Sequence, residues 1–323
     1  MLADKIAKKF LLFFVFIFLI STVFSVIQLS PSPHLISMTN FQASASDAIQ
    51  LIDQVDQLDA SILNDEEILQ NEENNFQLSA RSAFSIELND KNIGKTLFEK
   101  NKDENLPIAS LVKLMTALVV LENYNLDQNI TISKSAMDQV GEQGELKGGQ
   151  TLSVKNLLYI MLIESSNKSA FALSEVIGND SFINLMNRNA EKIGLLNTYF
   201  DDVTGLNENS YSTANDLSKI SSYLFLNYPL FYKIISLKEF DLYLDDGSFH
   251  HKLINTNELL GQSDVVGGKT GYTIAAKGCF MAIQEKSPKN YIIHIILGSE
   301  DRFLEMKKLI NFLDYNYPVL ALR

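Results

Sequence analysis

The sequence predicts an α+β fold in which strands from both ends of the chain form one mixed sheet that carries a helical insert. Ser82 to Asn89 alternates as a strand, and Lys95 to Lys100 returns after turn residues as its antiparallel partner. Near the C-terminus, Lys277 to Gln284 and Tyr291 to Gly298 again have strand patterns, and a helix is expected from about Phe303 to Leu313.

The middle of the chain has apolar residues at helical spacing. It predicts helices over Leu111 to Leu121, Val154 to Ile163, Ser169 to Ile177 and Phe182 to Ile193. A length of 323 residues leaves room for an anchor, a spacer and one sizeable domain, so two large cores are not expected.

The charge balance excludes one class of partner. With 27 Lys and Arg against 39 Asp and Glu, the net charge is −12. Clustered cations supply most of the affinity for nucleic acids, so no nucleic-acid partner is expected. Cys279 is the only cysteine, so the chain can form no internal disulfide.

The N-terminus has the pattern of a membrane anchor. Residues 1–9 contain three lysines and form the expected cytoplasmic tip, and the uncharged run 10–28 would span roughly 28 Å as a helix. The next basic residue is Arg81, so the positive-inside rule places everything after the run outside the cytoplasm. A cleaved signal peptide is the alternative, and the domain would then be secreted.

Residues 29–80 have a different composition. They contain Pro31 and Pro33, nine acidic residues (at 47, 53, 56, 59, 65, 66, 67, 72 and 73) and no Lys or Arg. This composition predicts an acidic stalk, partly disordered, ahead of a catalytic domain at 81–323.

Ser110 and Lys113 begin the first strong helical pattern. Residues three apart share a helix face, so the amine can act as base for the hydroxyl. To accept a proton near pH 7, the Lys113 pKa must fall by about 3 units, which burial or a second cation would favour. Ser165 and Lys168 have the same spacing, so a Ser at a helix start beside a solvated Lys remains an alternative.

Two further motifs carry polar groups. Ser165-Ser166-Asn167 interrupts two apolar helical stretches and can face a cleft, although helix capping is an alternative. Gly267 to Gly271 precedes a strand pattern, and its bare backbone would let a peptide lie against the strand edge while Lys269 and Thr270 meet a carboxylate. The alternative for this motif is a glycine-rich turn with an exposed lysine.

The three motifs occur in the order Ser-x-x-Lys, Ser-x-Asn and Lys-Thr-Gly, about 55 and then about 104 residues apart. In this order the chain resembles the low-molecular-mass penicillin-binding proteins, the serine D-Ala-D-Ala carboxypeptidases of the S11 peptidase family. The likeness runs from about Arg81 to the C-terminus. It includes residues 107–116, 204–206, 212–216, 257–260 and 268–273.

The resemblance implies a β-lactamase/transpeptidase-like α+β fold, with a mainly antiparallel sheet packed by helices and an all-helical subdomain. It makes Ser110 the acylated nucleophile and Lys113 its base. Ser165 and Asn167 would complete the polar cleft, relaying a proton and holding the peptide amide.

The resemblance also implies a substrate-binding set. Lys269 and Thr270 would face the terminal carboxylate, supported by Arg302. Gly271 and Tyr272 continue the same motif, and the backbone N–H groups of Ser110 and Tyr272 would form the oxyanion hole. Two positions stand apart, because Asp216 falls on a family position without an assigned role and Lys168 replaces the usual Asp or Asn.

The implied partners are peptidoglycan stem peptides, with β-lactam antibiotics as covalent inhibitors. The implied location is the bacterial cell membrane, with a single N-terminal span and the catalytic domain outside. No cofactor is expected. No metal is expected either, because no His-Glu-x-x-His motif or clustered carboxylate accompanies the four histidines.

The favoured function is removal of the terminal D-alanine from a peptidoglycan pentapeptide by an acyl-enzyme mechanism. A D,D-endopeptidase that cuts cross-links would use the same residues. A β-lactamase would need a base for rapid deacylation, and the sequence offers no clear counterpart of the family glutamate. A catalytically silent wall-binding protein would be expected to lack Ser110, Lys113 or Lys269, and all three are present.

Overall fold

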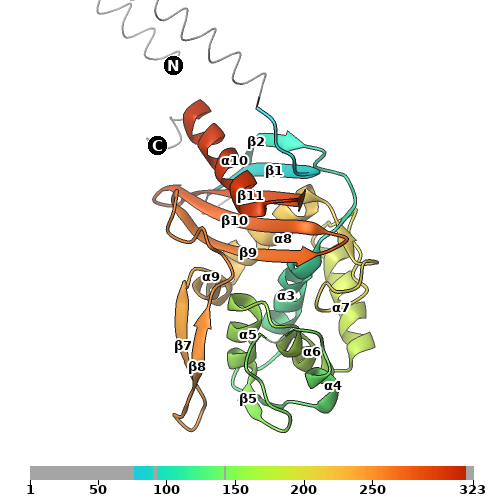
Figure 1. Cartoon of the computed structure of the whole chain (residues 1–323). Coiled ribbons are helices and arrows are strands. Elements are labelled where there is room, and N and C mark those ends of the chain that lie inside the picture. Colours follow the sequence, from blue (N-terminus) through green and yellow to red (C-terminus); the bar gives the residue numbers. More distant parts are fainter. Residues whose placement is uncertain (1–75, 90–92, 142, 318–323) are drawn as a thin grey trace, which may run out of the picture. The chain divides into compact units, whose positions relative to one another are not determined.

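The computed structural model describes residues 76–89, 93–141 and 143–317 (Figure 1). The expected anchor and most of the expected stalk lie outside the described residues. The folded part begins before Arg81, because Leu78 and Ala80 are buried and the Phe76 ring stacks on Phe312 at 4.1 Å. Within the described part, no helix is both long and apolar enough to cross a bilayer.

One five-stranded sheet has the strand order β2-β1-β11-β10-β9, and every neighbouring pair is antiparallel. The strands are β1 (Ser82–Asn89), β2 (Ile93–Lys100), β9 (Val265–Thr273), β10 (Lys277–Ser287) and β11 (Asn290–Ser299). The mixed sheet expected from the strand patterns is therefore wrong in one respect, since no strand pair among the described residues is parallel. The mainly antiparallel sheet implied by the resemblance is confirmed.

Helices cover both faces of this sheet (Figure 1). Alternate residues of β10 face opposite ways, as a strand requires. Phe280 packs in the apolar cluster that includes Leu309 of α10 (Arg302–Asn316), whereas Met281 packs in the cluster that includes Leu217 of α8 (Ala214–Asn227). The sheet thus separates two buried apolar layers.

A helical region forms the rest of the domain, as the resemblance implies. It comprises η1 (Ala109–Val112), α3 (Lys113–Asn123), α4 (Lys134–Met137), α5 (Val154–Ile163), α6 (Asn167–Glu175), α7 (Asn179–Lys192) and α9 (Pro229–Ile235). The predicted helix at 154–163 matches α5. The one predicted at 169–177 begins earlier, at Asn167, because the Ser166 hydroxyl caps α6 by accepting a hydrogen bond from the Ser169 amide.

Short antiparallel pairs join these layers. They are β3 (Leu106–Pro107) with β6 (Tyr211–Ser212), β4 (Asn129–Thr131) with β5 (Thr151–Ser153), and β7 (Glu239–Tyr243) with β8 (Phe249–Ile254). The pair β7–β8 matters for the site, because the chain leaving β8 returns to α5, where the Thr256 amide donates to the Ile163 carbonyl at 3.1 Å.

Candidate active site

Ser110 and Lys113 lie at the junction of η1 and α3, so they share one helical turn. The Lys113 Nζ lies 2.9 Å from the Ser110 Oγ. Ser110 is half-buried, whereas Lys113 is fully buried. This pair has the geometry of a nucleophile and its base.

Three polar atoms surround the Lys113 amine. Besides Ser110, it donates to the Asn167 Oδ1 and to the Thr204 carbonyl, both at 2.7 Å. Burial lowers the pKa of Lys113 to about 7, and the negative charge of Asp202 acts in the opposite direction. An amine with this pKa is neutral in a large fraction of molecules at pH 7, so it can accept the serine proton.

The loop 202–206 holds the Thr204 carbonyl in place. One oxygen of Asp202, Oδ2, accepts from the backbone amides of Thr204, Gly205 and Leu206 at 2.8–3.1 Å. Gly205 has φ +86°, and a Cβ there would lie 1.9 Å from the Ala109 carbonyl oxygen, so only glycine lets this loop contact η1. Sequence reasoning assigned no role to this loop, although it quoted residues 204–206 for the resemblance.

The Ser165-Ser166-Asn167 motif both caps a helix and contributes side chains to the site. Ser166 caps α6 and donates to the Gln143 carbonyl at 2.8 Å, which is a structural role. Ser165 has φ +65°, and its hydroxyl instead accepts a hydrogen bond from the Lys269 Nζ at 2.8 Å. Asn167 links Lys113 to the loop before α5, because its Nδ2 donates to the Val140 carbonyl at 2.8 Å.

The Lys-Thr-Gly motif lies within β9, at the edge of the sheet, rather than before a strand as expected. The sequence placed the strand too late because glycines weaken a strand pattern. In β9 the glycines instead let other parts of the backbone approach the strand closely. Lys269 is buried, not exposed, and burial lowers its pKa well below the usual value, with the charges of Lys113 and Arg302 adding to the effect. An arriving carboxylate would favour its charged form.

Gly271 lets β9 approach Ser110 closely. A Cβ at this position would lie 2.9 Å from the Ser110 backbone nitrogen and 3.0 Å from the Ala109 Cβ. The strand edge therefore runs directly beside η1. The oxyanion hole expected from the backbone amides of Ser110 and Tyr272 stays a prediction.

Arg302 is the first residue of α10, and its side chain contacts β9. Its Nη1 donates to the Gly271 carbonyl at 3.3 Å, and its guanidinium carbon lies 4.7 Å from the Phe303 ring centroid. The Nε is buried and has no hydrogen-bond partner among the described residues. A guanidinium held in this way keeps donors available for an anion.

These residues surround one cavity of about 210 Å³. It is lined by Ser110, Gln143, Glu164, Ser165, Asn167, Leu206, Thr256, Thr270, Gly271, Tyr272, Thr273 and Arg302. The structure thus brings together all the predicted site residues, with Lys113 and Lys269 bonded to Ser110 and Ser165 on its wall. Glu164 and Thr256 were missed by sequence reasoning, since neither lies in a motif of its own.

Thr256 contacts Thr270, the threonine of the Lys-Thr-Gly motif. The two hydroxyl oxygens, Thr270 Oγ1 and Thr256 Oγ1, are 2.7 Å apart. A second hydroxyl can hold the first in a fixed orientation toward a ligand in the cavity.

Asp216 has a structural role outside the cavity. Its carboxylate accepts from the Asn197 amide at 2.7 Å and from the Lys219 amine at 2.7 Å. It thereby joins the start of α8 to the chain after α7. Lys168 is buried on α6 and is not among the residues that line the cavity.

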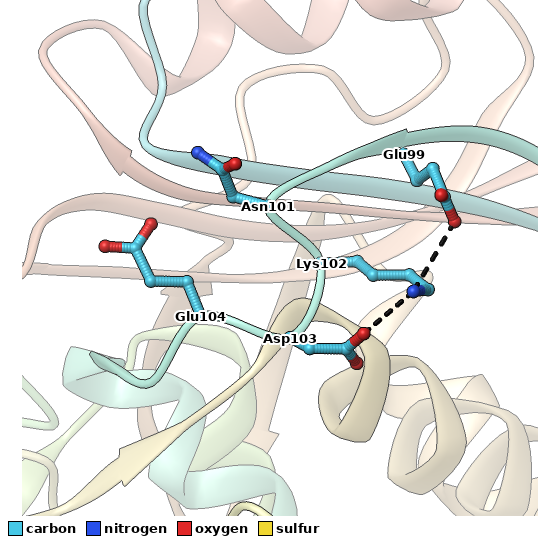
Figure 2. A pocket seen from close by; sticks show the side chains of 5 residues that line it. All are labelled: Glu99, Asn101, Lys102, Asp103 and Glu104. Atoms are coloured by element: carbon cyan, nitrogen blue, oxygen red, sulfur yellow. Dashed lines mark hydrogen bonds and ion pairs between the residues drawn. The ribbon is translucent and has the colours of Figure 1, made fainter.

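A larger hollow of about 500 Å³ lies elsewhere, at the turn after β2 (Figure 2). It contains ion pairs of Lys102 with Asp103 at 2.7 Å and with Glu99 at 3.6 Å. None of the predicted site residues lines it, so its size does not indicate the chemistry. Across the described ranges, no three His, Cys, Asp or Glu side chains are grouped to hold a metal ion.

The sequence of this chain is similar to those of known D-alanyl-D-alanine peptidases. The family model described as D-alanyl-D-alanine carboxypeptidase matches residues 69–301. D-alanyl-D-alanine carboxypeptidase DacF of Bacillus subtilis is 32% identical over 72% of this chain, and the match spans 62% of that protein, less than two thirds of its length. A D-alanyl-D-alanine endopeptidase of Pseudomonas aeruginosa is 30% identical over 70% of this chain and 75% of its own length.

Solved structures show the same fold. The crystal structure of the Streptomyces K15 DD-transpeptidase has a TM-score of 0.68 and 31% sequence identity to this chain. The match covers 74% of this chain and 98% of that one.

Proposed function

The chain belongs to the D-alanyl-D-alanine carboxypeptidase family, the S11 serine peptidases, and from this premise we propose that it removes the terminal D-alanine of peptidoglycan pentapeptides through an acyl-enzyme on Ser110. One observation carries the proposal, namely the 2.9 Å contact between the Ser110 hydroxyl and an amine whose pKa burial lowers to about 7.

In acylation, the Ser110 Oγ attacks the carbonyl carbon of the bond between the two D-alanines, and neutral Lys113 takes the hydroxyl proton. The oxyanion that forms receives hydrogen bonds from the Ser110 and Tyr272 amides. The intermediate then collapses as the leaving nitrogen gains a proton relayed through Ser165. The products are free D-alanine and a Ser110 ester.

In deacylation, water attacks the ester carbonyl and gives a proton to Lys113, which has returned to its neutral form. The Ser110 oxygen leaves and regains its proton. The shortened peptide is released, and the site returns to its starting state.

Recognition of the chain end is the task of Lys269, Thr270 and Arg302. The lowered pKa of Lys269 leaves the empty site with less positive charge, and a substrate carboxylate would favour the protonated amine. A free chain end therefore gains binding energy from its carboxylate. An internal peptide segment has no such carboxylate and binds more weakly.

The direct test is incubation of the domain with a D-Ala-D-Ala pentapeptide, followed by mass analysis of the products. We expect free D-alanine and the tetrapeptide, and no product from the Ser110→Ala variant. An active enzyme that leaves pentapeptide intact while cutting cross-linked muropeptides would contradict this function. It would favour the endopeptidase activity that the names of relatives in Pseudomonas aeruginosa and Escherichia coli suggest.

The proposed location is the outer side of the cytoplasmic membrane, with residues 10–28 as the anchor and 29–80 as the stalk. The lysines before residue 10 and the absence of Lys and Arg from there to Arg81 support this orientation. Protease added to spheroplasts is expected to release the catalytic domain. Protection until lysis would mean that the orientation is reversed.

A further inference from the structure

Glu164 places a carboxylate on the wall of the catalytic cavity. It lies between the end of α5 and Ser165, whose hydroxyl faces Lys269. Among the described lining residues it is the only acidic one. No step of the mechanism above uses it, and its side chain is only 15% exposed.

A histidine holds this carboxylate. The Glu164 Oε2 lies 3.0 Å from the His251 Nε2, and the Oε1 accepts from the Ile254 amide at a longer 3.4 Å. On its other side, the His251 Nδ1 lies 2.5 Å from the His250 Nδ1. Contacts between neighbouring side chains therefore connect the β7–β8 hairpin to the cavity wall, from His250 through His251 to Glu164.

The short contact between the two histidines limits how their protons can be placed. Only one hydrogen fits between the two Nδ1 atoms, and in the arrangement in which His250 donates it, His251 donates from Nε2 to Glu164. Burial together with the neighbouring His251 lowers the pKa of His250. The β7–β8 hairpin thus supplies a hydrogen-bond partner to each oxygen of Glu164.

Burial of a carboxylate is costly, and a cationic ligand group in the cavity offsets that cost. Lys269 compensates it poorly in the empty site, because burial favours its neutral form. Lys269, Thr270 and Arg302 at the same site suit an anion. The cavity therefore offers complementary sites for a ligand that carries both charges.

We propose that Glu164, oriented by His251, is a selectivity residue that binds a primary ammonium group of a molecule entering the cleft. This inference rests on the proposed acyl-enzyme function and extends it. The ammonium has two sources, the side chain of the substrate peptide or an amine that replaces water in attack on the acyl-enzyme. In the second case the ammonium first releases one proton to solvent, and the neutral amine nitrogen then bonds to the ester carbonyl carbon and gives a second proton to Lys113. The bond to the Ser110 Oγ breaks as that oxygen takes a proton from Lys113.

The first arm compares two peptides, Nα-acetyl-Lys-D-Ala-D-Ala with a free side-chain ammonium and its Nε-acetylated form. Wild type should prefer the free ammonium, and Glu164→Gln should lower the ratio of the two kcat/KM values by about 5- to 30-fold, the loss of one charge-assisted contact. Glu99→Gln removes an exposed carboxylate far from the cavity and should leave the ratio unchanged. His251→Gln should lower the ratio less than Glu164→Gln, since it only orients the carboxylate.

The second arm measures how the acyl-enzyme partitions between water and added glycinamide. A drop in aminolysis for Glu164→Gln with no change in the peptide ratio assigns the ammonium to the attacking amine. The proposal would be overturned if Glu164→Gln changed neither the ratio of the two kcat/KM values nor the partition of the acyl-enzyme. Equal losses of activity on both peptides with an unchanged partition would overturn it too, because Glu164 would then not distinguish a ligand that carries an ammonium.

A third measurement separates this proposal from the carboxypeptidase function. Acylation rates with ampicillin, which carries a primary ammonium, and with benzylpenicillin, which lacks it, need no peptide hydrolysis. If wild type cleaves neither peptide, the proposed function fails, and the ampicillin to benzylpenicillin ratio still tests Glu164. A ratio unchanged by Glu164→Gln in an enzyme without peptidase activity would reject the ammonium site as well.

Discussion

At the scale of single residues, the proposed chemistry depends on two buried lysines. Lys113 and Lys269 are both fully enclosed, and burial lowers the pKa of each. Sequence reasoning anticipated that Lys113 needs a lowered pKa to act as base. It did not identify what encloses this lysine, because the Thr204 carbonyl and Asn167 come from distant segments.

The rate of Ser110 acylation should follow the neutral fraction of Lys113. Because the base is active only when unprotonated, the second-order rate constant with benzylpenicillin should rise about tenfold per pH unit below pH 7 and level off above it. Stopped-flow measurements from pH 5 to pH 9 check this. A rise centred near pH 10 would mean that Lys113 keeps an ordinary pKa.

Arg302→Ala should weaken recognition of the terminal carboxylate while sparing the acylation chemistry. A charge-assisted bond contributes roughly 1.5 to 3 kcal/mol, so kcat/KM on the pentapeptide should fall about 10- to 150-fold. Acylation by a reactive thioester without a terminal carboxylate should persist.

A matched control is Lys307→Ala, which removes an exposed cation from the same helix. It should retain pentapeptide activity. Equal losses of Arg302→Ala on both substrates would place Arg302 in folding or acylation, and unchanged pentapeptide activity would remove it from the site.

At the scale of elements, the site forms where a loop and an edge strand approach η1 without side chains between them. Local patterns predict some of this well, since the apolar spacing of Val154 to Ile163 coincides with α5. They predict other parts poorly. The Gly267–Gly271 stretch has only one strand-forming side chain, Thr270, yet all of it pairs with β10, because pairing with β10 outweighs local propensity.

Gly205→Ala should disrupt the contact of the 202–206 loop with η1. Its φ of +86° costs an alanine about 1–2 kcal/mol, and the clash with the Ala109 carbonyl adds to this. Gly247→Ala is the matched control, with φ +82° and no atom within 4 Å of the added Cβ. We expect Gly205→Ala to lower the Tm further than Gly247→Ala does and to slow acylation at least about tenfold. Equal effects of the two changes would show that the close approach is unimportant.

At the scale of the whole molecule, the sheet and the helical region bring residues about 104 positions apart into contact at Ser165 and Lys269. Spacing along the chain cannot predict such a contact. The resemblance to a family predicted it, whereas the residue patterns alone left each motif with an alternative explanation. Glu164 and His251 fall outside those motifs, so only the folded arrangement connects them with the site.

His294 should make the domain sensitive to mild acid. It is buried in the sheet between Ser85 and Gln284, and burial together with Lys286 lowers its pKa to about 3. Because the unfolded chain binds this proton near pH 6.5 and the folded chain does not, stability present above pH 6.5 is lost as pH falls toward 3. The loss from this group between pH 7 and pH 5 should be about 2 kcal/mol.

Urea unfolding of wild type and His294→Gln at pH 7 and pH 5 isolates this contribution, because the other titrating groups are common to both. The variant should show a smaller drop than wild type. An identical drop in both proteins would mean that His294 takes up its proton without unfolding.

The central claim is that Ser110 is the nucleophile of an acyl-enzyme, and intact-mass analysis after exposure to benzylpenicillin tests it most directly. The account predicts one added penicillin per chain, mapped by proteolysis to the peptide that contains Ser110, and no adduct on Ser110→Ala. An adduct that persists in Ser110→Ala, or that maps to another residue of the wild-type protein, would contradict it.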